Sequence, residues 1–226
     1  MPKPCALSAL LCWLAAAAGT PTAGAQSAVL APLDADEPIT YFIAEGEPGS
    51  AYRDSDRELA QWALEAWRRS ANGALELTPA PESEALVRIY WVPASAGQYG
   101  EMRPLRVDGR RGAAVYIRPD VRALGADIAR GATEDPLLRE TIVYLTCLHE
   151  LGHALGLTHT AEYADVMYFF GFGGDIPQFF GRYRDRLRSR DDIAGVSGLS
   201  QGDLAQLEAL YGGAAPASIG AERERL

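Results

Sequence analysis

The chain contains three histidines, and all of them lie in one short stretch, at His149, His153 and His159. His149 and His153 are four residues apart, so on an α-helix their imidazoles lie one above the other on the same face. Two imidazoles in this arrangement can bind one small cation. The spacing therefore indicates a metal site that is built on a helix.

Gly156 follows the second histidine by three residues. Glycine can adopt the left-handed conformation that ends a helix and turns the chain back, and such a turn would bring His159 to the pair as a third ligand. Three protein nitrogens leave one tetrahedral position of Zn²⁺ for water, which is typical of a catalytic site rather than a structural one. Glu150 directly follows the first histidine and can lie beside that water as a general base without binding the metal.

The residues before the motif predict the helix that would position these side chains. Asp135 and Pro136 are a favourable start, because Asp can cap the first turn and Pro fits the first helical position. Apolar residues then recur at helical spacing up to the histidines, at Leu138, Ile142, Leu145 and Leu148. A helix packed along this stripe would hold the ligands rigidly. Cys147 is expected to point away from the metal into the core, as a small buried apolar residue.

Residues 149–159 match H-E-x-x-H-x-x-G-x-x-H at every fixed position, and they resemble the zinc motif of the metzincin clan of peptidases. Thr160 follows the third histidine, where the matrixin family of this clan usually has Ser or Thr. Residues 165–168 resemble the Met-turn, which in the clan places a methionine, here Met167, beneath the zinc site. Residues 199–212 resemble the last helix of a matrixin catalytic domain.

The resemblance implies an α+β fold: a twisted mixed β-sheet with two helices in the N-terminal subdomain, the zinc-site helix, the Met-turn and a C-terminal helix. It also implies a zinc-dependent endopeptidase that acts on protein or peptide substrates with one catalytic Zn²⁺. His149, His153 and His159 would bind the zinc, and Glu150 would be the general base. Two alternatives stay open: a secreted zinc-binding interaction module without turnover, and a zinc hydrolase that acts on a non-peptide amide.

The composition and the start of the chain bear on partners and location. The net charge of −9 argues against a nucleic-acid partner, because phosphate binding requires a basic surface. Residues 1–25 have the features of a secretory signal peptide: Lys3, an apolar stretch at 6–18 that is too short to span a bilayer, and the small-residue cleavage site Ala23-Gly24-Ala25. We therefore expect a secreted or periplasmic monomer without a stable membrane span.

The remaining chain is expected to form one catalytic domain at residues 38–212, after a linker at 26–37 and before a disordered tail at 213–226. Once the signal peptide is removed, Cys147 would be the only cysteine, so no intramolecular disulfide is expected. In the last helix, Ser200 would be the cap. One apolar side of that helix would be buried through Leu204, Leu207 and Leu210.

Short β-rich runs predict strands at residues 39–43, 75–78, 86–92 and 113–118. The run at 86–92 is apolar on both faces, which favours a central position in the sheet. Residues 55–58 resemble a capping box and predict the start of a helix that ends at Asn72-Gly73. Residues 99–107 are the candidate for an edge strand that pairs with extended substrate, because Pro104 cannot donate to a ladder. The alternative is a plain surface hairpin.

Several features after the Met-turn leave more than one interpretation open. Phe169 stands where matrixins commonly have proline, so the wall of the main specificity pocket is not inferred from the family. The aromatic residues in 168–180 either line a large apolar pocket or form core beneath a long loop. Tyr168 or Tyr183 could help to bind the oxyanion. The alternating arginines from Arg182 to Arg190 form either a solvated arm or a basic rim that favours acidic substrate.

Calcium is a second candidate cofactor, with weaker support than zinc. The acidic residues that could contribute are Asp120, Asp127, Glu134 and Asp135. Their spacing does not match a calcium-binding loop, so the sequence predicts one zinc and leaves calcium without a motif.

Overall fold

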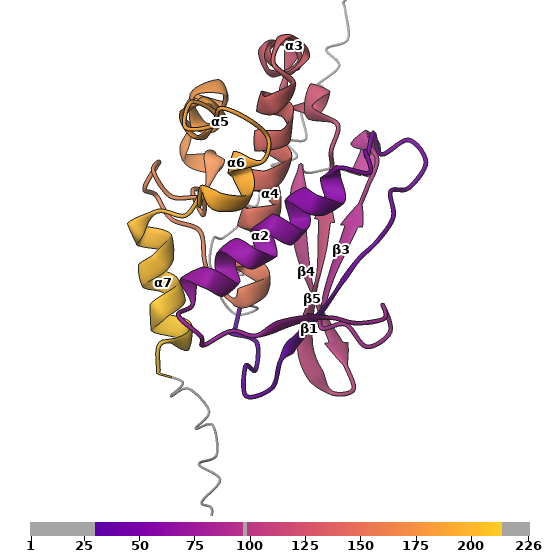
Figure 1. The fold of residues 1–226 in the computed structure, drawn as a ribbon, viewed down its shortest axis with the longest axis vertical. Helices are drawn as coiled ribbons and strands as arrows, with labels where there is room; N and C mark the ends of the chain where they lie inside the picture. The colour runs from indigo at the N-terminus through magenta and orange to yellow at the C-terminus, as the bar shows by residue number, and fades with distance from the viewer. Residues whose placement is uncertain (1–29, 97–98, 214–226) are drawn as a thin grey trace, which may run out of the picture.

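The computed structural model describes residues 30–96 and 99–213 (Figure 1). The expected signal peptide and nearly all of the expected tail lie outside these residues. In chain order the strands and helices are β1 (Ile39–Ile43), α2 (Asp56–Ser70), β2 (Leu77–Pro79), β3 (Val87–Trp91), β4 (Gly100–Val107), β5 (Arg110–Ile117), α3 (Ala126–Glu134), α4 (Pro136–Leu155), α5 (Ile176–Arg184), α6 (Asp192–Gly195) and α7 (Gln201–Tyr211). Short 3-10 turns lie at η1 (Ala94–Ala96), η2 (Val121–Leu124) and η3 (Phe170–Phe172). The α+β class predicted from the sequence is confirmed.

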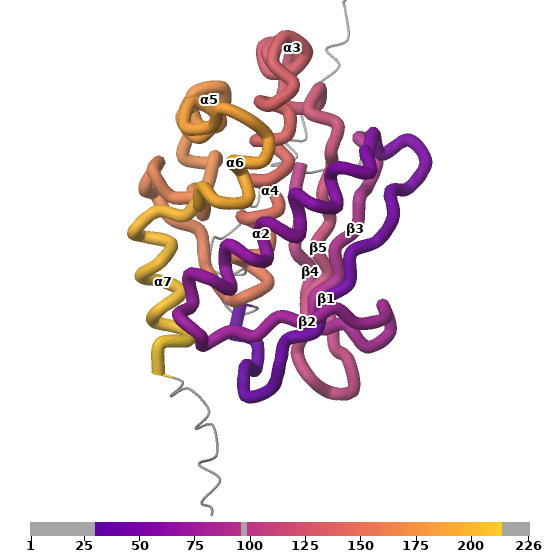
Figure 2. The backbone as a smooth tube through the Cα atoms, in the orientation of Figure 1, coloured from indigo at the N-terminus to yellow at the C-terminus, as the bar shows by residue number. Residues whose placement is uncertain are grey.

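The five strands form one mixed sheet in the order β2-β1-β3-β5-β4. β3 is central, as predicted, and it pairs in parallel with β1 and β5. β4 lies at the edge and runs antiparallel to β5, with Pro104 opposite Ala113, so the predicted edge strand is confirmed. Asp108 and Gly109 join the two strands with positive φ angles of 50° and 82°. This tight hairpin, visible in Figure 2, lets β5 begin before the predicted start at residue 113.

Helices α2 and α4 pack against each other, and α4 also packs against β4 and β5 (Figure 1). Trp67 of α2 is fully buried and donates its indole N–H to the Leu148 carbonyl of α4 over 2.9 Å. A buried ion pair joins the same two helices, since Arg139 Nη2 lies 2.8 Å from Asp56 Oδ2. The predicted apolar stripe on α4 is buried at Ile142, Leu145 and Leu148. Its packing fixes α4 against the rest of the domain.

The capping box predicted at residues 55–58 is wrong. Ser55 has helical dihedral angles, φ −66° and ψ −17°, instead of the extended angles of a capping residue, and its side chain makes no cap hydrogen bond. Asp56 is instead drawn inward, where its carboxylate accepts the Arg53 N–H over 2.9 Å and pairs with Arg139. The helix itself was predicted correctly and ends before Asn72 and Gly73, which both have positive φ.

The last helix, α7, begins with a capping box in which the Ser200 hydroxyl accepts the Asp203 N–H, so the predicted cap is confirmed. Its predicted buried side is only partly right. Leu207 is buried, but Leu204 and Leu210 are half-buried, because α7 turns Asp203 and Tyr211 inward. The Tyr211 hydroxyl donates to the Leu155 carbonyl over 2.7 Å and accepts the Leu33 N–H over 3.0 Å. Residues 30–37, which belong to the expected linker, therefore contact the domain through Leu33.

Helices α3, α5 and α6 were not predicted. Asp175 caps α5 by accepting the Gln178 N–H over 2.8 Å, and Pro177 lies in the first turn, so a start signal was present in the sequence. None of the helices within residues 30–96 and 99–213 combines the length and the apolar content needed to cross a bilayer.

Candidate metal centre

Helix α4 carries the first part of the site. The Asp135 carboxylate caps it by accepting the Leu137 N–H over 3.1 Å, and Pro136 occupies the first turn, as predicted. The helix ends at Gly156, which has a left-handed φ of 105°. A side chain at Gly156 would also come within 2.9 Å of the Pro32 nitrogen. Both the turn and the close approach of the N-terminal segment therefore require glycine.

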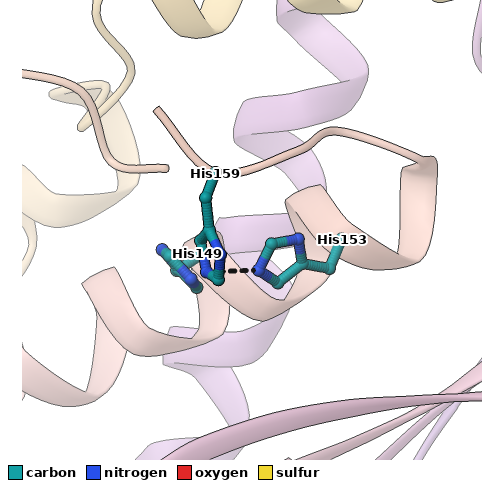
Figure 3. A group of neighbouring side chains, drawn as sticks. All are labelled: His149, His153 and His159. Atoms are coloured by element: carbon teal, nitrogen blue, oxygen red, sulfur yellow. Dashed lines mark hydrogen bonds between the residues drawn. The ribbon is translucent and has the colours of Figure 1, made fainter. Parts of the chain in front are cut away.

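The turn at Gly156 brings His159 back to His149 and His153, so the three predicted ligands lie together (Figure 3). One nitrogen from each ring can be chosen so that all three lie within 4.8 Å of one another. His153 Nε2 and His159 Nε2 are 3.1 Å apart, as the dashed line in Figure 3 marks. Among the described residues, no other group of three or more His, Cys, Asp or Glu side chains could hold a metal ion.

Backbone carbonyls orient two of the imidazoles. His149 Nδ1 lies 2.6 Å from the Val166 oxygen, and His153 Nδ1 lies 2.9 Å from the Leu157 oxygen. A carbonyl can only accept, so each Nδ1 carries the proton and each Nε2 presents its lone pair. Burial lowers the pKa of His149 to about 3 and that of His159 to about 4, and it also lowers the pKa of His153. The three rings are neutral at physiological pH, as ligands of Zn²⁺ must be.

The Met-turn lies directly behind the helix that carries the ligands. Met167 is fully buried, and a side chain at Gly152 of α4 would lie 2.5 Å from its sulfur. The Asp203 carboxylate of α7 accepts the N–H groups of Val166 and Met167 over 2.9 and 3.2 Å. Because the Val166 carbonyl orients His149, α7 supports the metal site through the Met-turn. This role of Asp203 was not predicted from the sequence, where only Ser200 was expected to cap the last helix.

Glu150 is buried beside the histidines, and β4 passes close to it. Burial, and after it the charge of Glu101, raises the pKa of Glu150 to about 8. A side chain at Gly100 of β4 would lie 2.8 Å from the Glu150 Cγ. Gly100 therefore leaves the space in which the carboxylate lies. Gly100 was not among the predicted site residues, although a glycine inside a predicted strand is a known sign of close approach.

Comparison with known proteins identifies the family to which this site belongs. A family model for matrixins, peptidase family M10, matches residues 34–201. The chain belongs to the matrixin family. This matrixin is 27% identical over 164 residues to the interstitial collagenase of Sus scrofa, an alignment that covers 71% of this chain and 31% of the relative. It is 28% identical over 167 residues to the macrophage metalloelastase of Oryctolagus cuniculus, in an alignment that covers 73% of this chain and 32% of the relative.

The chain spans about a third of the length of these relatives. Matrixins are zinc-dependent metallopeptidases, and the three converging imidazoles of this matrixin fit that metal by the number, type and protonation of their nitrogens. The predicted resemblance to metzincins, and to matrixins among them, is confirmed.

A cavity of about 500 Å³ opens in front of the histidines and Glu150. Gly100, Glu101 and Met102 of β4 line it, together with side chains from residues 168–180, called the aromatic segment below: Tyr168, Phe169, Phe170, Ile176, Phe179 and Phe180. Phe179 and Phe180 are also buried in the core, so both interpretations of the aromatic segment hold. Tyr183 does not line the cavity; its hydroxyl donates to the Val196 carbonyl over 2.6 Å, which speaks against a role in binding the oxyanion.

The arginines from 182 to 190 differ in their contacts: Arg186 and Arg188 are exposed, as expected for a solvated arm, whereas Arg184 and Arg190 make ion pairs. Arg184 pairs with Asp135 over 2.6 Å, and Arg190 pairs with Glu58 over 2.8 Å and with Glu140 over 3.4 Å. They tie the segment after the Met-turn to α2 and α4. Arginines also pair with candidate calcium ligands, since Asp120 and Asp127 contact Arg122 and Arg130.

The buried Glu150 predicts how the stability of the zinc-free matrixin depends on pH. Its pKa is about 8 in the folded state against 4.5 for an ordinary glutamate, so the folded state holds a proton that the unfolded chain has lost. Stability should fall as pH rises through this range, by at most about 1.4 kcal/mol per pH unit. Below about pH 7.5 the three histidines, with lowered pKa values, oppose this trend, because the unfolded chain still binds protons on their rings that the folded state does not.

In the window between about pH 7.5 and 8.5 the unfolded histidines have lost most of their protons, so Glu150 makes the largest contribution to the pH dependence. Urea unfolding of the zinc-free protein across this window should show a decline, and Glu150→Gln should flatten it. An equal decline in the variant would assign the pH dependence to other groups.

Proposed function

We propose that this matrixin is a secreted zinc endopeptidase that hydrolyses peptide bonds in protein or peptide substrates. The observation that carries the proposal is the convergence of three neutral imidazoles beside a buried carboxylate, in a cleft with a strand edge along one side. Membership of the matrixin family supports the same reaction class.

His149, His153 and His159 would hold the zinc, with Val166 and Leu157 orienting two of them through their carbonyl groups. When bound, Zn²⁺ supplies a Lewis acid that polarises the scissile carbonyl and makes water more acidic. The Glu150 carboxylate would take a proton from the attacking water and deliver it to the leaving amine. Burial raises the pKa of Glu150 in the zinc-free protein, and the positive charge of bound zinc would lower it, which would favour the ionised carboxylate that the base requires.

β4 would hold the substrate. In strand addition, an extended peptide hydrogen-bonds to the free edge of a sheet through its main chain. Gly100 and Met102 line the cavity from β4, so a peptide paired with this strand would lie across Glu150. Pro104 donates no hydrogen bond, which would limit the pairing to the part of the strand near the metal site.

The location outside the cytoplasm rests on residues 1–25, whose pattern is that of a signal peptide. We further propose that residues 38–212 form the catalytic domain and 213–226 a tail. N-terminal sequencing of exported protein tests the first point: a chain that begins at Gln26 or Ser27 supports it, and a retained Met1 contradicts it.

The test of activity uses purified residues 26–226 with one zinc bound per chain and an unfolded protein as substrate. We expect internal fragments, no cleavage after zinc removal by a chelator, and recovery when zinc is added back. A folded, zinc-loaded protein that cleaves no substrate would favour the alternative of a zinc-binding module without turnover.

A further inference from the structure

Two large apolar side chains stand out on the surface of the described residues. Phe169 is 43% exposed and Phe172 is 64% exposed, whereas the other large apolar side chains in this part of the chain are more buried. Their rings contact each other edge to face, with centroids 5.5 Å apart. A pair of phenylalanines held in contact at the surface is costly in water, and adjacent exposed apolar residues of this kind are typical of a binding surface.

One member of the pair, Phe169, lies next to the candidate metal site. The Phe169 ring stacks on the His159 imidazole, with centroids 4.8 Å apart and planes 28° apart, and it lines the same cavity as Glu150. Phe172 contacts the Phe169 ring, is largely exposed and does not line the cavity, so it extends this apolar surface beyond the cavity. The two rings, called the aromatic rim below, thus connect the edge of the catalytic cleft to the outer surface.

The backbone holds the aromatic rim in place. The Phe169 N–H donates to the Thr160 carbonyl over 3.2 Å, and the Phe172 N–H donates to the Phe169 carbonyl over 3.0 Å. The buried Tyr168 donates its hydroxyl to the Gly173 carbonyl over 3.1 Å. A side chain at Gly171 would overlap the Phe169 ring, so glycine there allows the ring to take this position. A surface that is ordered before binding loses little entropy on contact with a ligand.

We propose that the aromatic rim is a second specificity site, which binds an apolar side chain of the substrate near the scissile bond. The proposal rests on the endopeptidase function proposed above. The inner cavity, with Phe179 and Phe180 in its wall, would take one side chain. In an extended peptide, side chains on the same side are about 7 Å apart. Because Phe169 lines the same cavity as Gly100 and Met102 of β4, one peptide along β4 would present a second side chain to the aromatic rim.

The test starts from a cleavage site found in an unfolded substrate. Peptides that span this site are made with Leu or Ala at each of the positions flanking the scissile bond, and kcat/KM is measured for each. Wild type should prefer Leu at one position in addition to the position served by the inner cavity. Phe172→Ala should reduce this second preference by about fivefold and leave kcat/KM for the Ala peptide within about twofold.

Phe172 is the residue to change, because it touches neither the histidines nor the cavity and its ring is largely exposed. Leu210→Ala, on α7, is the control and should leave both preferences unchanged. Zinc content and melting temperature of each variant show that the metal site and the fold are intact. If wild type cleaves no peptide, the proposed function itself fails. Cleavage without a second preference, or an equal loss for all peptides in Phe172→Ala, overturns the aromatic rim alone.

Two further measurements test whether the aromatic rim binds a second copy of the chain or a lipid surface instead of substrate. If Phe172→Ala abolishes a concentration-dependent dimer seen by sedimentation and keeps the second preference, the rim binds another copy of the chain. If wild type, but not the variant, pellets with phosphatidylcholine vesicles and the preference is unchanged, the rim binds lipid. Either result overturns the proposal.

Discussion

Glu150→Gln should lower kcat/KM by about a thousandfold while one zinc stays bound per chain. Glutamine keeps the shape of the buried side chain, so its packing against Gly100 is preserved. It cannot take a proton from water and pass it to the leaving amine. The three imidazoles, which would hold the metal, are left unchanged. The measurement is kcat/KM on one peptide, together with zinc content and melting temperature.

The matched control is Glu101→Gln, which removes the nearest acidic charge at the same cavity. We expect its activity to stay within about tenfold of wild type, since it is not placed to act as the base. Because Glu101 raises the pKa of Glu150, the control should also move the acid limb of the pH–rate profile to lower pH. A Glu150→Gln variant with full zinc and wild-type rate would show that another group is the base.

Arg139→Met should destabilise the protein by about 3–5 kcal/mol. Asp56 and Arg139 have side chains that are 0% and 5% exposed, and they join α2 to the first part of α4. Methionine removes the cation and leaves the Asp56 carboxylate buried with no opposite charge in contact. That cost is larger than the net contribution of the intact pair, because desolvation of the remaining charge is no longer offset. Urea unfolding of the zinc-free protein measures the loss.

Arg130→Met is the control for this prediction. Arg130 forms an ion pair with Asp127 on α3, and their side chains are 63% and 77% exposed. Water screens this pair, so the free energy of unfolding should hardly change. An equal loss of unfolding free energy in the two variants would contradict the prediction that the buried pair matters more than the exposed one. Asp56→Asn combined with Arg139→Met should recover part of the loss, since no unpaired charge then remains buried.

The parts of this molecule that sequence analysis predicted are those that local patterns determine. The ligand spacing on α4, its Asp135-Pro136 start and its Gly156 end all depend on residues a few positions apart, and the structure has them as predicted. The edge position of β4 was predicted from Pro104 alone, because proline has no N–H to donate to a neighbouring strand and so favours a sheet edge. The convergence of the three histidines needed only the turn at Gly156.

The parts that were missed depend on contacts between distant residues. The capping box at residues 55–58 failed because Asp56 pairs with Arg139, which lies 83 positions away. Asp203 supports the Met-turn across 36 and 37 positions, and no local pattern encodes that contact. In α5, alternating arginines hid a helical spacing whose buried side consists of Phe179, Phe180 and Tyr183. Tertiary contacts explain the misses at Asp56 and Asp203, whereas the signal for α5 was local and was concealed by a second local pattern.

The edge strand β4 also affects self-association of the protein. A strand edge that can accept a peptide can in principle accept the same strand of another copy, which is the usual first step of β-sheet aggregation. Within the described chain, no strand covers the outer edge of β4. Arg103 and Arg106 are exposed on β4 on either side of the exposed Pro104. Arg103 is paired with Glu101 over 2.8 Å, so the charge of Arg106 and the missing donor of Pro104 oppose strand-to-strand pairing over this half of β4, while the half near Glu150 stays open.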